Sequence, residues 1–405
     1  MKRYLCSSII CLVVLLSIGT YYVKVASSAS SLPTYTFKTS EGSVKELDPV
    51  IVQATLEHHN FYDPLTIESN QTKYDSDRPF WSDRNDVQIE RLVKEHRSFM
   101  RGKDLIDSFY EDDDFLAYAS LHSEYMQSGK MKAELGIGVL EKKGKDETSF
   151  RIDLPHQERI MNAEVRDVQL INSKLQVFTM IDVYSNDDKQ TKEIHLYTID
   201  LANEKVVSDK TLVSETFTYP NQVDFEMPVN TSPSKPNNMI LFSIMKGVNH
   251  EEGDYEEKLK ESKLFSYQYD TGKLSTIKGA KKESLNLDIA RSGYTDGKNL
   301  YAIAFKSGKY QMKTFDISSG ALTNDIQLDL AVGKEEAYCV AIKNGRVYFL
   351  LGSGMGENLT YKPAHLLIAD LKTGKTLYKG ETVMHAAKKK NEQKTGFSVN
   401  NLEVK

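Results

Sequence analysis

The chain is poor in cysteine, and this scarcity limits what can stabilise its body. Only three of its 405 residues are Cys, and two of them, Cys6 and Cys11, lie in an apolar N-terminal segment. Cys339 is then the single thiol of the body and cannot form an internal disulfide, so core burial must supply the stability. The neighbours Tyr338 and Val340 indicate a strand, in which a thiol serves as a small hydrophobe rather than as a nucleophile.

The chain also lacks a strong excess of charge of either sign. It has 52 Lys and Arg against 57 Asp and Glu, a net charge of −5, which gives no reason to expect nucleic acid or a strongly anionic membrane as partner. Only 11 of the cations are Arg, which argues against an extended phosphate-reading surface. With 40% hydrophobic residues, the composition is that of a folded globular protein.

A long hydrophobic run is present only at the N-terminus. Two cations precede an apolar run from Tyr4 to Val23, and a helix of that length spans roughly 30 Å, the thickness of a bilayer core. The positive flank places the following chain outside the cytoplasm. A cleaved signal peptide is equally compatible, because Ser27–Ala29 offers small residues for cleavage. We expect residues 1–30 to be a membrane anchor or signal peptide, and residues 31–405 to be an extracytoplasmic domain, membrane-held or secreted.

A repeated hairpin pattern dominates the body. Each copy has a short apolar strand, an acidic or amide residue, a turn ending in Gly or a substitute, and a second strand. The four clear copies are Leu196–Val206, Leu264–Leu274, Met312–Leu322 and Leu366–Thr376, with a fainter fifth at Ile137–Lys145. Their turn residues are Glu204, Gly272, Gly320, Gly374 and Gly144. A Gly at this point of a hairpin supplies the positive φ that the turn needs.

The acidic residue before each turn has a structural role. Asp200, Asp316 and Asp370 can accept hydrogen bonds from backbone N–H groups two or three residues on and so close the turn. We therefore assign these carboxylates to turn formation rather than to catalysis.

A second element precedes each hairpin: a turn and then a strongly apolar strand. The strands follow turns at Asn172, Asn237, Asp296 and Lys343, and they are too apolar to be half solvated. Each repeat then contains a buried inner strand and an outer hairpin, which predicts a four-stranded antiparallel unit. The fold class is therefore all-β.

The Asp-x-x-Thr-Gly-Lys hairpin resembles the outer strands of blades in quinoprotein-type (pyrroloquinoline-quinone) and related bacterial β-propellers. The resemblance covers residues 113–380 and implies a β-propeller of six to eight four-stranded blades. It implies no activity, because such hairpins recur in unrelated functions. Quinoprotein dehydrogenases are rich in Trp at blade junctions, whereas this chain has the single Trp81, outside the repeats. We therefore expect no quinone cofactor.

Residues 31–112 fit the repeat less well. They contain strand-like stretches at Val50–Leu56 and Leu65–Glu68, and the C-terminus ends in another at Gly396–Val404. Pairing of N-terminal and C-terminal strands would remove exposed sheet edges, and we predict it. The acidic stretch Gly247–Ser262 is predicted to be a solvated insertion.

A short helix is predicted over residues 86–101. Asp86 can cap its start, Gly102 follows its end, and apolar residues recur at helical spacing. His96 falls on the apolar stripe, where a packed histidine is a better interpretation than a metal ligand.

No pattern identifies a site. His58 and His59 are adjacent on a strand and point to opposite faces, so they cannot easily share an ion. The acidic run Glu111–Asp114 is interpreted as a solvated turn rather than as a calcium site. Gly352–Gly356 lacks the Lys-Ser/Thr of a P-loop, and no Gly-x-Ser-x-Gly elbow occurs. We predict no metal and no cofactor, and we assign no catalytic residue.

Two functions remain open. The preferred one is an extracytoplasmic, membrane-associated binding or accessory module for an envelope protein or membrane complex. The alternative is a secreted or anchored hydrolase or lyase that uses a metal or carboxylates in the propeller funnel. The 22 Tyr offer contact area for binding, although we expect most of them to pack within the blades.

Overall fold

The computed structural model describes most of the chain, and strands dominate it. The described residues are 10, 12–20, 32–58, 61–77, 86–125, 131–155, 160–183, 189–248, 258–277, 293–306, 309–328, 337–352, 363–385 and 395–405. Within them, 26 strands form six sheets of four or five strands each. The all-β prediction is therefore confirmed. Four of the sheets are four-stranded and antiparallel as predicted, whereas the other two have a fifth strand, and one of these contains a parallel pair. A ring of blades stays a prediction.

The chain divides into two compact units. The terminal unit contains Met1–Val87, Phe305–Tyr310 and Gln327–Lys405, and the central unit contains Gln88–Ala304 and Gln311–Ile326. Each unit is described separately below.

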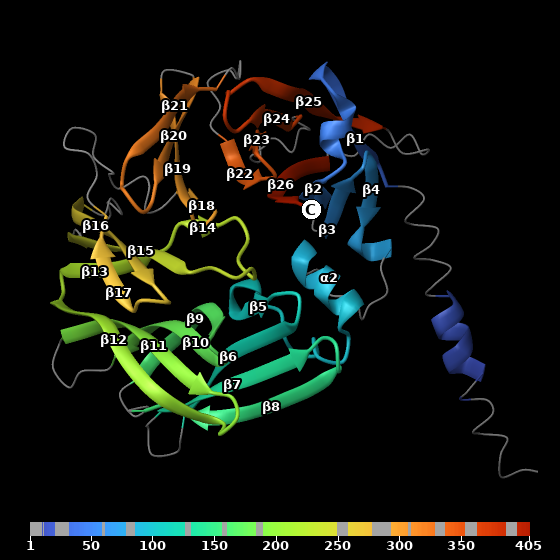
Figure 1. The fold of residues 1–405 in the computed structure, drawn as a ribbon. Helices are drawn as coiled ribbons and strands as arrows, with labels where there is room; N and C mark the ends of the chain where they lie inside the picture. The colour runs from blue at the N-terminus through green and yellow to red at the C-terminus, as the bar shows by residue number, and fades with distance from the viewer. Residues whose placement is uncertain are drawn as a thin grey trace, which may run out of the picture. The chain divides into compact units, whose positions relative to one another are not determined.

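The terminal unit has a five-stranded and a four-stranded sheet. The first consists, in spatial order, of β1 (Thr34–Gly42), β25 (Thr376–His385), β24 (His365–Asp370), β23 (Arg346–Leu351) and β22 (Ala337–Lys343). The second consists of β26 (Thr395–Val404), β2 (Val50–His58), β3 (Phe61–Glu68) and β4 (Gln71–Tyr74), with the 3-10 turns η1 (Val44–Leu47) and η2 (Asp75–Asp77) beside them. The N-terminal strands β1 and β2 pair antiparallel with the C-terminal strands β25 and β26, as Figure 1 shows in blue and red. The predicted pairing of the two ends of the chain is confirmed.

One hydrophobic core joins these two sheets. Tyr35 near the start of β1 stacks on Phe397 near the C-terminus, with ring centroids 4.4 Å apart, and Tyr35 is fully buried. Val52, Leu366 and Tyr378 belong to the same core. Burial of each such side chain contributes roughly 1.5–3 kcal/mol, so the contacts that link the ends of the chain are also stabilising ones.

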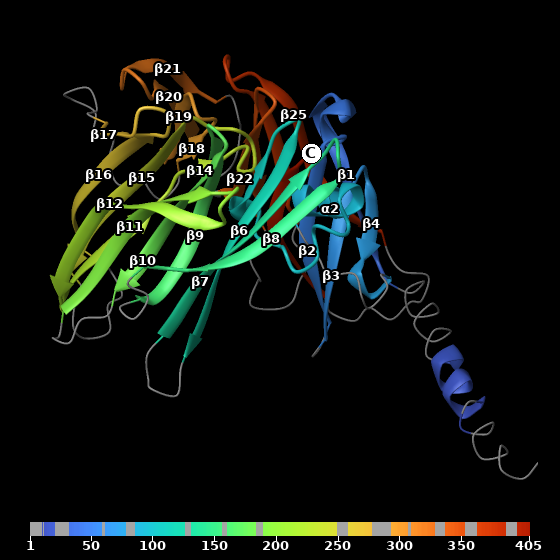
Figure 2. The same ribbon diagram turned by 60° about the horizontal axis from the view of Figure 1, so that its bottom comes forward.

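The central unit holds the other four sheets. They are β5 (Phe109–Glu111), β6 (Phe115–Tyr125), β7 (Met131–Glu141) and β8 (Asp146–Asp153); β12 (Lys205–Thr218), β11 (Lys189–Asp200), β10 (Lys174–Val183) and β9 (Ile160–Ile171); β13 (Asn221–Glu226), β15 (Met239–Val248), β16 (Lys258–Gln268) and β17 (Lys273–Thr276); and β14 (Val229–Asn230), β18 (Tyr294–Thr295), β19 (Asn299–Lys306), β20 (Lys309–Asp316) and β21 (Leu322–Gln327). The last sheet includes the few residues around 305–310 and Gln327 that cluster with the terminal unit. Figures 1 and 2 show β5–β8 followed by β9–β12.

The predicted outer hairpins are present. Glu204, Gly272, Gly320 and Gly374 all have positive φ, between 50° and 73°, at the turns of β11–β12, β16–β17, β20–β21 and β24–β25. In the fainter fifth copy the prediction was wrong by one residue, because Lys145 rather than Gly144 has the positive φ.

The carboxylates before the turns accept backbone hydrogen bonds as predicted. Asp200 Oδ1 accepts from the N–H groups of Ala202 and Asn203, and Asp370 Oδ1 from those of Lys372 and Thr373. Asp316 does the same with the amide of a residue three positions on. Their structural role is confirmed.

The predicted burial of the inner strands on both faces holds for two of them. Most side chains of β15 and β23 are buried on both faces, whereas β10 is buried mainly on one face. The prediction was wrong for β19, the strand after Asp296, in which only Leu300 and Tyr301 are buried among the described side chains. Asn172 and Asn344 have positive φ in the two-residue turns that lead into β10 and β23.

Two predicted segments differ from the structure. The helix α2 runs only from Val87 to Glu95, and residues 97–102 form turns instead of continuing it. The Ser98 hydroxyl bonds to Glu147 of β8 and Phe99 is buried against that sheet, so tertiary contacts redirect the chain before the helical pattern ends. The insertion at Gly247–Ser262 is shorter than predicted, since its first two residues continue β15 and its last five begin β16.

The predicted N-terminal anchor has no support in the structure. Residues 12–20 are helical, and the rest of the predicted span falls almost wholly outside the described residues. No helix in the described part of the chain is long and apolar enough to cross a membrane.

Candidate functional site

The acidic run at Glu111–Asp114 is part of the structural framework. Burial alone would raise the pKa of the Glu111 carboxyl, but hydrogen bonds from Arg91 of α2 and from Lys142, at 2.9 Å, lower it to about 2. Asp112 Oδ1 accepts from the amides of the next turn. The prediction of a solvated turn was wrong for Glu111, whose 3% exposure reflects its pairing with two cations.

A metal site beside this ion pair is disfavoured by its charges. Glu95, His96 and Glu111 each offer one ligand atom, all within 4.8 Å of one another. Arg91 already pairs with both carboxylates, at 2.7 Å to Glu95, and Lys142 pairs with Glu111. A divalent ion would have to displace these cations, and His96 is half-buried beside them with its pKa lowered by burial and by Lys142.

The sheet β5–β8 has two different faces. Ala117, Ala119 and Leu135 on one face pack into the core shared with β9–β12. On the other face, Leu116 and Tyr118 pack beneath α2 and the turn that follows it. α2 and this turn cover only part of the length of β6 and β7.

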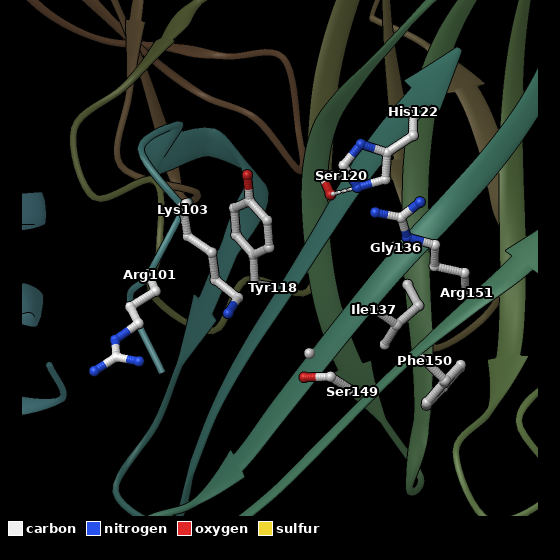
Figure 3. Close-up of a pocket in the computed structure, with 12 residues that line it drawn as sticks. Arg101, Lys103, Tyr118, Ser120, His122, Gly136, Ile137, Ser149, Phe150 and Arg151 are labelled. Carbon is white, nitrogen blue, oxygen red and sulfur yellow. Dashed lines mark hydrogen bonds between the residues drawn. The ribbon is translucent and has the colours of Figure 1, made fainter. Parts of the chain in front are cut away.

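Where the cover ends, the sheet carries a hollow of about 390 Å³. It is lined by Arg101, Gly102, Lys103, Tyr118, Ser120, His122, Gly136, Ile137, Gly138, Ser149, Phe150 and Arg151. Figure 3 shows Arg101 and Lys103, from the turn after α2, on one side and His122 and Arg151 on the other.

Strand register brings these residues together. Tyr118 of β6, Gly138 of β7 and Ser149 of β8 form one cross-strand row. Ser120, Gly136 and Arg151 form the next row, two residues further along β7. All six lie on one face, because side chains two residues apart on a strand share a face.

The two glycines of β7 make room for side chains that lie over the strand. A Cβ at Gly136 would lie 2.8 Å from His122 Nε2 and 3.1 Å from Ser120 Oγ, and one at Gly138 would lie 3.2 Å from Lys103 Cε and 3.3 Å from the Phe99 ring. Without these Cβ atoms, the neighbouring side chains can lie directly on the strand. Two glycines two residues apart in a strand are the one sequence signal for this site, and the hairpin pattern covers that stretch only in its faintest copy.

The lining is cationic. Arg101, Lys103 and Arg151 supply three positive charges, and none of the twelve lining residues is acidic. Lys103 Nζ donates to the Phe99 carbonyl and lies 4.2 Å from the Phe99 ring centroid, and burial lowers its pKa. An ammonium group has three donors, so Lys103 keeps donors for a ligand.

Neutral donors complete the hollow. Ser120 Oγ lies 3.2 Å from His122 Nε2, and Figure 3 shows the Arg151 side chain extending toward this pair. Burial raises the pKa of the Tyr118 phenol. The arrangement of cations and hydroxyls is one that binds an anionic group.

A second polar cluster lies at the junction of β9 with the end of β16. Asp167 is 5% exposed and accepts hydrogen bonds from the Tyr269 hydroxyl at 2.5 Å and from Gln169 Nε2 at 3.1 Å. Burial raises the pKa of Asp167 to about 6. Side-chain donors engage both oxygens, so this carboxyl serves the structure and not a substrate.

The other residues considered in the sequence analysis either have structural roles or lie outside the described residues. Cys339 is in β22, partly buried against the terminal core, and burial raises its pKa, as fits a structural thiol. His58 ends β2, whereas His59, Trp81 and residues 353–356 fall outside the described residues. Eleven of the Tyr are buried, in agreement with a packing role.

Comparisons with known proteins identify no family. No family model and no curated protein matches the chain. Among solved structures, similarity is found to the polysaccharide lyase Uly1 (12% identity over 65% of this chain and 57% of that one, TM-score 0.40). An oligogalacturonate lyase in complex with manganese (11%, 85% and 84%, TM-score 0.35) and TolB from Acinetobacter baumannii (13%, 87% and 67%, TM-score 0.29) are also similar. The chain thus spans little more than half of the length of Uly1, and TM-scores this low carry no argument about activity.

Proposed function

We propose that the chain is an exported binding module of the β-propeller type, whose hollow on β6–β8 receives an anionic group of a protein partner at the cell envelope. The observation that carries the proposal is the lining of this hollow, with three cations, several hydroxyls and no acid. Glu134, outside the lining, pairs with Arg151 at 3.6 Å, but the lining itself carries only positive charge. Such a hollow attracts anions and gains affinity when Arg forms paired hydrogen bonds to a carboxylate or phosphate.

Binding is favoured over chemistry by the state of the carboxylates. Two of the buried carboxyl groups, Glu111 and Asp167, are engaged by neighbouring side chains, so neither is free to act as general acid or base. This argues against catalysis by these two carboxylates, and the cations beside Glu111 argue against a metal there.

The test is binding of poly-L-glutamate to the full-length protein, measured by calorimetry at low and at high salt. The double variant Arg101→Glu/Arg151→Glu reverses two of the charges, and we expect it to bind at least about tenfold more weakly. The double variant Lys189→Glu/Lys205→Glu, at the exposed starts of β11 and β12, is the charge-matched control and should bind like wild type. Equal binding by the double variant, or none by wild type, would overturn the proposal.

A second candidate, hydrolysis, rests on one contact. Ser120 Oγ and His122 Nε2 are 3.2 Å apart, within reach of a nucleophile and its base. Ser120→Ala separates the candidates, because it would abolish ester hydrolysis but remove only one neutral donor from the hollow and leave its three cations in place.

The compartment is part of the proposal and is tested separately. It rests on the apolar segment Tyr4–Val23, and fractionation of the host with an epitope after Lys405 would check it. Recovery of the tagged protein from the cytosol would contradict export.

A further inference from the structure

The hollow has two binding positions arranged along β7, and its ligand can be described further if the proposed function holds. At the first position, Lys103 approaches Gly138 from the turn after α2, and Ser149 lies across from it on β8. At the second position, His122 and Ser120 approach Gly136, and Arg151 lies across from it. Each position offers at least one cation and one hydroxyl.

The spacing of the two positions is the repeat of a β-strand. Two residues along a strand span roughly 7 Å, and this is also the distance between alternate side chains of any extended peptide. A peptide lying along β7 with acidic residues two apart would place one carboxylate at each position. Adjacent acidic residues would point to opposite sides, so only one of them could reach the hollow.

The peptide would lie on the face of the sheet and not add to it as a strand. The backbone of β7 pairs with β6 on one side and with β8 on the other, so its ladder is complete. His122 and Ser120 lie over Gly136, and Lys103 and the Phe99 ring lie over Gly138, so the peptide would contact these side chains rather than the backbone of β7. Their charges and hydroxyls then provide the selectivity.

A carboxylate of the protein, at the next position along β7, limits how many alternate acidic residues the peptide can have. Glu134 lies on the same face two residues beyond Gly136, and it pairs with Lys132 at 2.5 Å and with Arg151 at 3.6 Å. A third alternate carboxylate on the ligand would be repelled by Glu134, whereas a Lys at that position would be attracted to it. At the other end, Leu140 lies beneath α2.

We infer that the partner presents an extended segment with two acidic residues at alternate positions, followed at the next alternate position by a neutral or basic residue. The inference rests on the proposed function for the anionic character of the ligand. What it adds is the class of partner, a peptide, and the spacing of its charges.

The test compares synthetic peptides of identical composition. One has the order Ser-Glu-Ser-Glu-Ser-Lys-Ser, and its isomer Ser-Ser-Glu-Glu-Ser-Lys-Ser has adjacent acids. We expect the alternating peptide to bind about fivefold more tightly by fluorescence anisotropy, since one exposed charge pair contributes up to about 1 kcal/mol. Arg151→Met should remove that preference, and Lys205→Glu should keep it.

The outcomes separate this inference from the proposed function. If poly-L-glutamate binds at the hollow but the two peptides bind equally, the spacing is wrong and only the inference fails. If polygalacturonate or polyphosphate binds at the hollow more tightly than any peptide, the ligand is a different polymer and the inference is again overturned. A melting temperature within about 2 °C of wild type verifies that Arg151→Met is folded.

Discussion

Two polar regions of the central unit, the cluster around Asp167 and the hollow on β6–β8, differ in how their groups are paired. Both oxygens of Asp167 accept hydrogen bonds from buried neighbours. In the hollow, Arg101 and Arg151 are exposed and have donors to spare. A buried, fully paired group holds strands together, whereas an exposed cation with spare donors is available to a ligand. The same distinction assigns the Glu111 ion pair to the framework.

The largest effect should come from breaking that framework. Arg91→Met leaves the buried Glu111 with Lys142 as its only remaining cation and should lower the free energy of unfolding by about 3 kcal/mol. Arg151→Met, in the hollow, should change it by less than about 0.5 kcal/mol. Urea denaturation measures both changes. Similar losses in the two variants would show that the Glu111 ion pair and the hollow do not differ in their contribution to stability.

The pH dependence of Asp167 should be the next largest effect. Its pKa is about 6 in the folded protein against 3.8 for the ordinary side chain, so the folded state binds the extra proton. Stability should therefore fall as the pH rises from about 4 to about 6, by about 2 kcal/mol. Asp167→Asn should flatten this part of the stability profile. A variant that keeps the wild-type slope between pH 4 and pH 6 would exclude this carboxyl as the cause.

These two regions also show what the sequence could and could not predict. The turn at Asp316 was predictable, because its carboxylate bonds to the amide of Ser319, three residues away. The hollow was not, since it requires the register that places Ser120, Gly136 and Arg151 in one row. Local chemistry specifies turns and strands, and long-range pairing assembles the site.

The shortened helix follows the same logic. The apolar spacing beyond Glu95 satisfied a helical pattern, but the contact of Ser98 with Glu147 and the burial of Phe99 direct the chain onto the sheet instead. Without that turn, Arg101 and Lys103 would not border the hollow.

A smaller pH effect is expected at His195 of β11, which contacts Asp209 of β12. Burial lowers its pKa, but hydrogen bonds with Asp209 at 2.6 Å and Glu193 at 3.0 Å outweigh this, so the pKa is raised above 6.5. The charged form stabilises the fold below about pH 6.5, and this contribution is lost as the pH rises through the folded pKa. His195→Gln should cost about 1 kcal/mol at pH 6 and less at pH 8, as measured by thermal denaturation. An equal loss at both pH values would mean that packing, not charge, explains the effect.

The smallest effect on stability, and the sharpest test of the comparison, is expected for Gly136→Ala. Replacing a strand glycine removes unfolded-state entropy and stabilises by about 0.5 kcal/mol, while the new Cβ, 2.8 Å from His122 Nε2 and 3.1 Å from Ser120 Oγ, displaces the ends of two side chains and no backbone. Stability should therefore stay the same or rise slightly. Anion binding should weaken, because the methyl group displaces His122 from its contact with Ser120. Gly138→Ala would bring a Cβ within 3.2 Å of Lys103 Cε and 3.3 Å of the buried Phe99 ring, so it should weaken binding at the other position but also lower stability. If both variants keep wild-type affinity for poly-L-glutamate, the side chains over these glycines have no part in binding and the glycines serve packing alone.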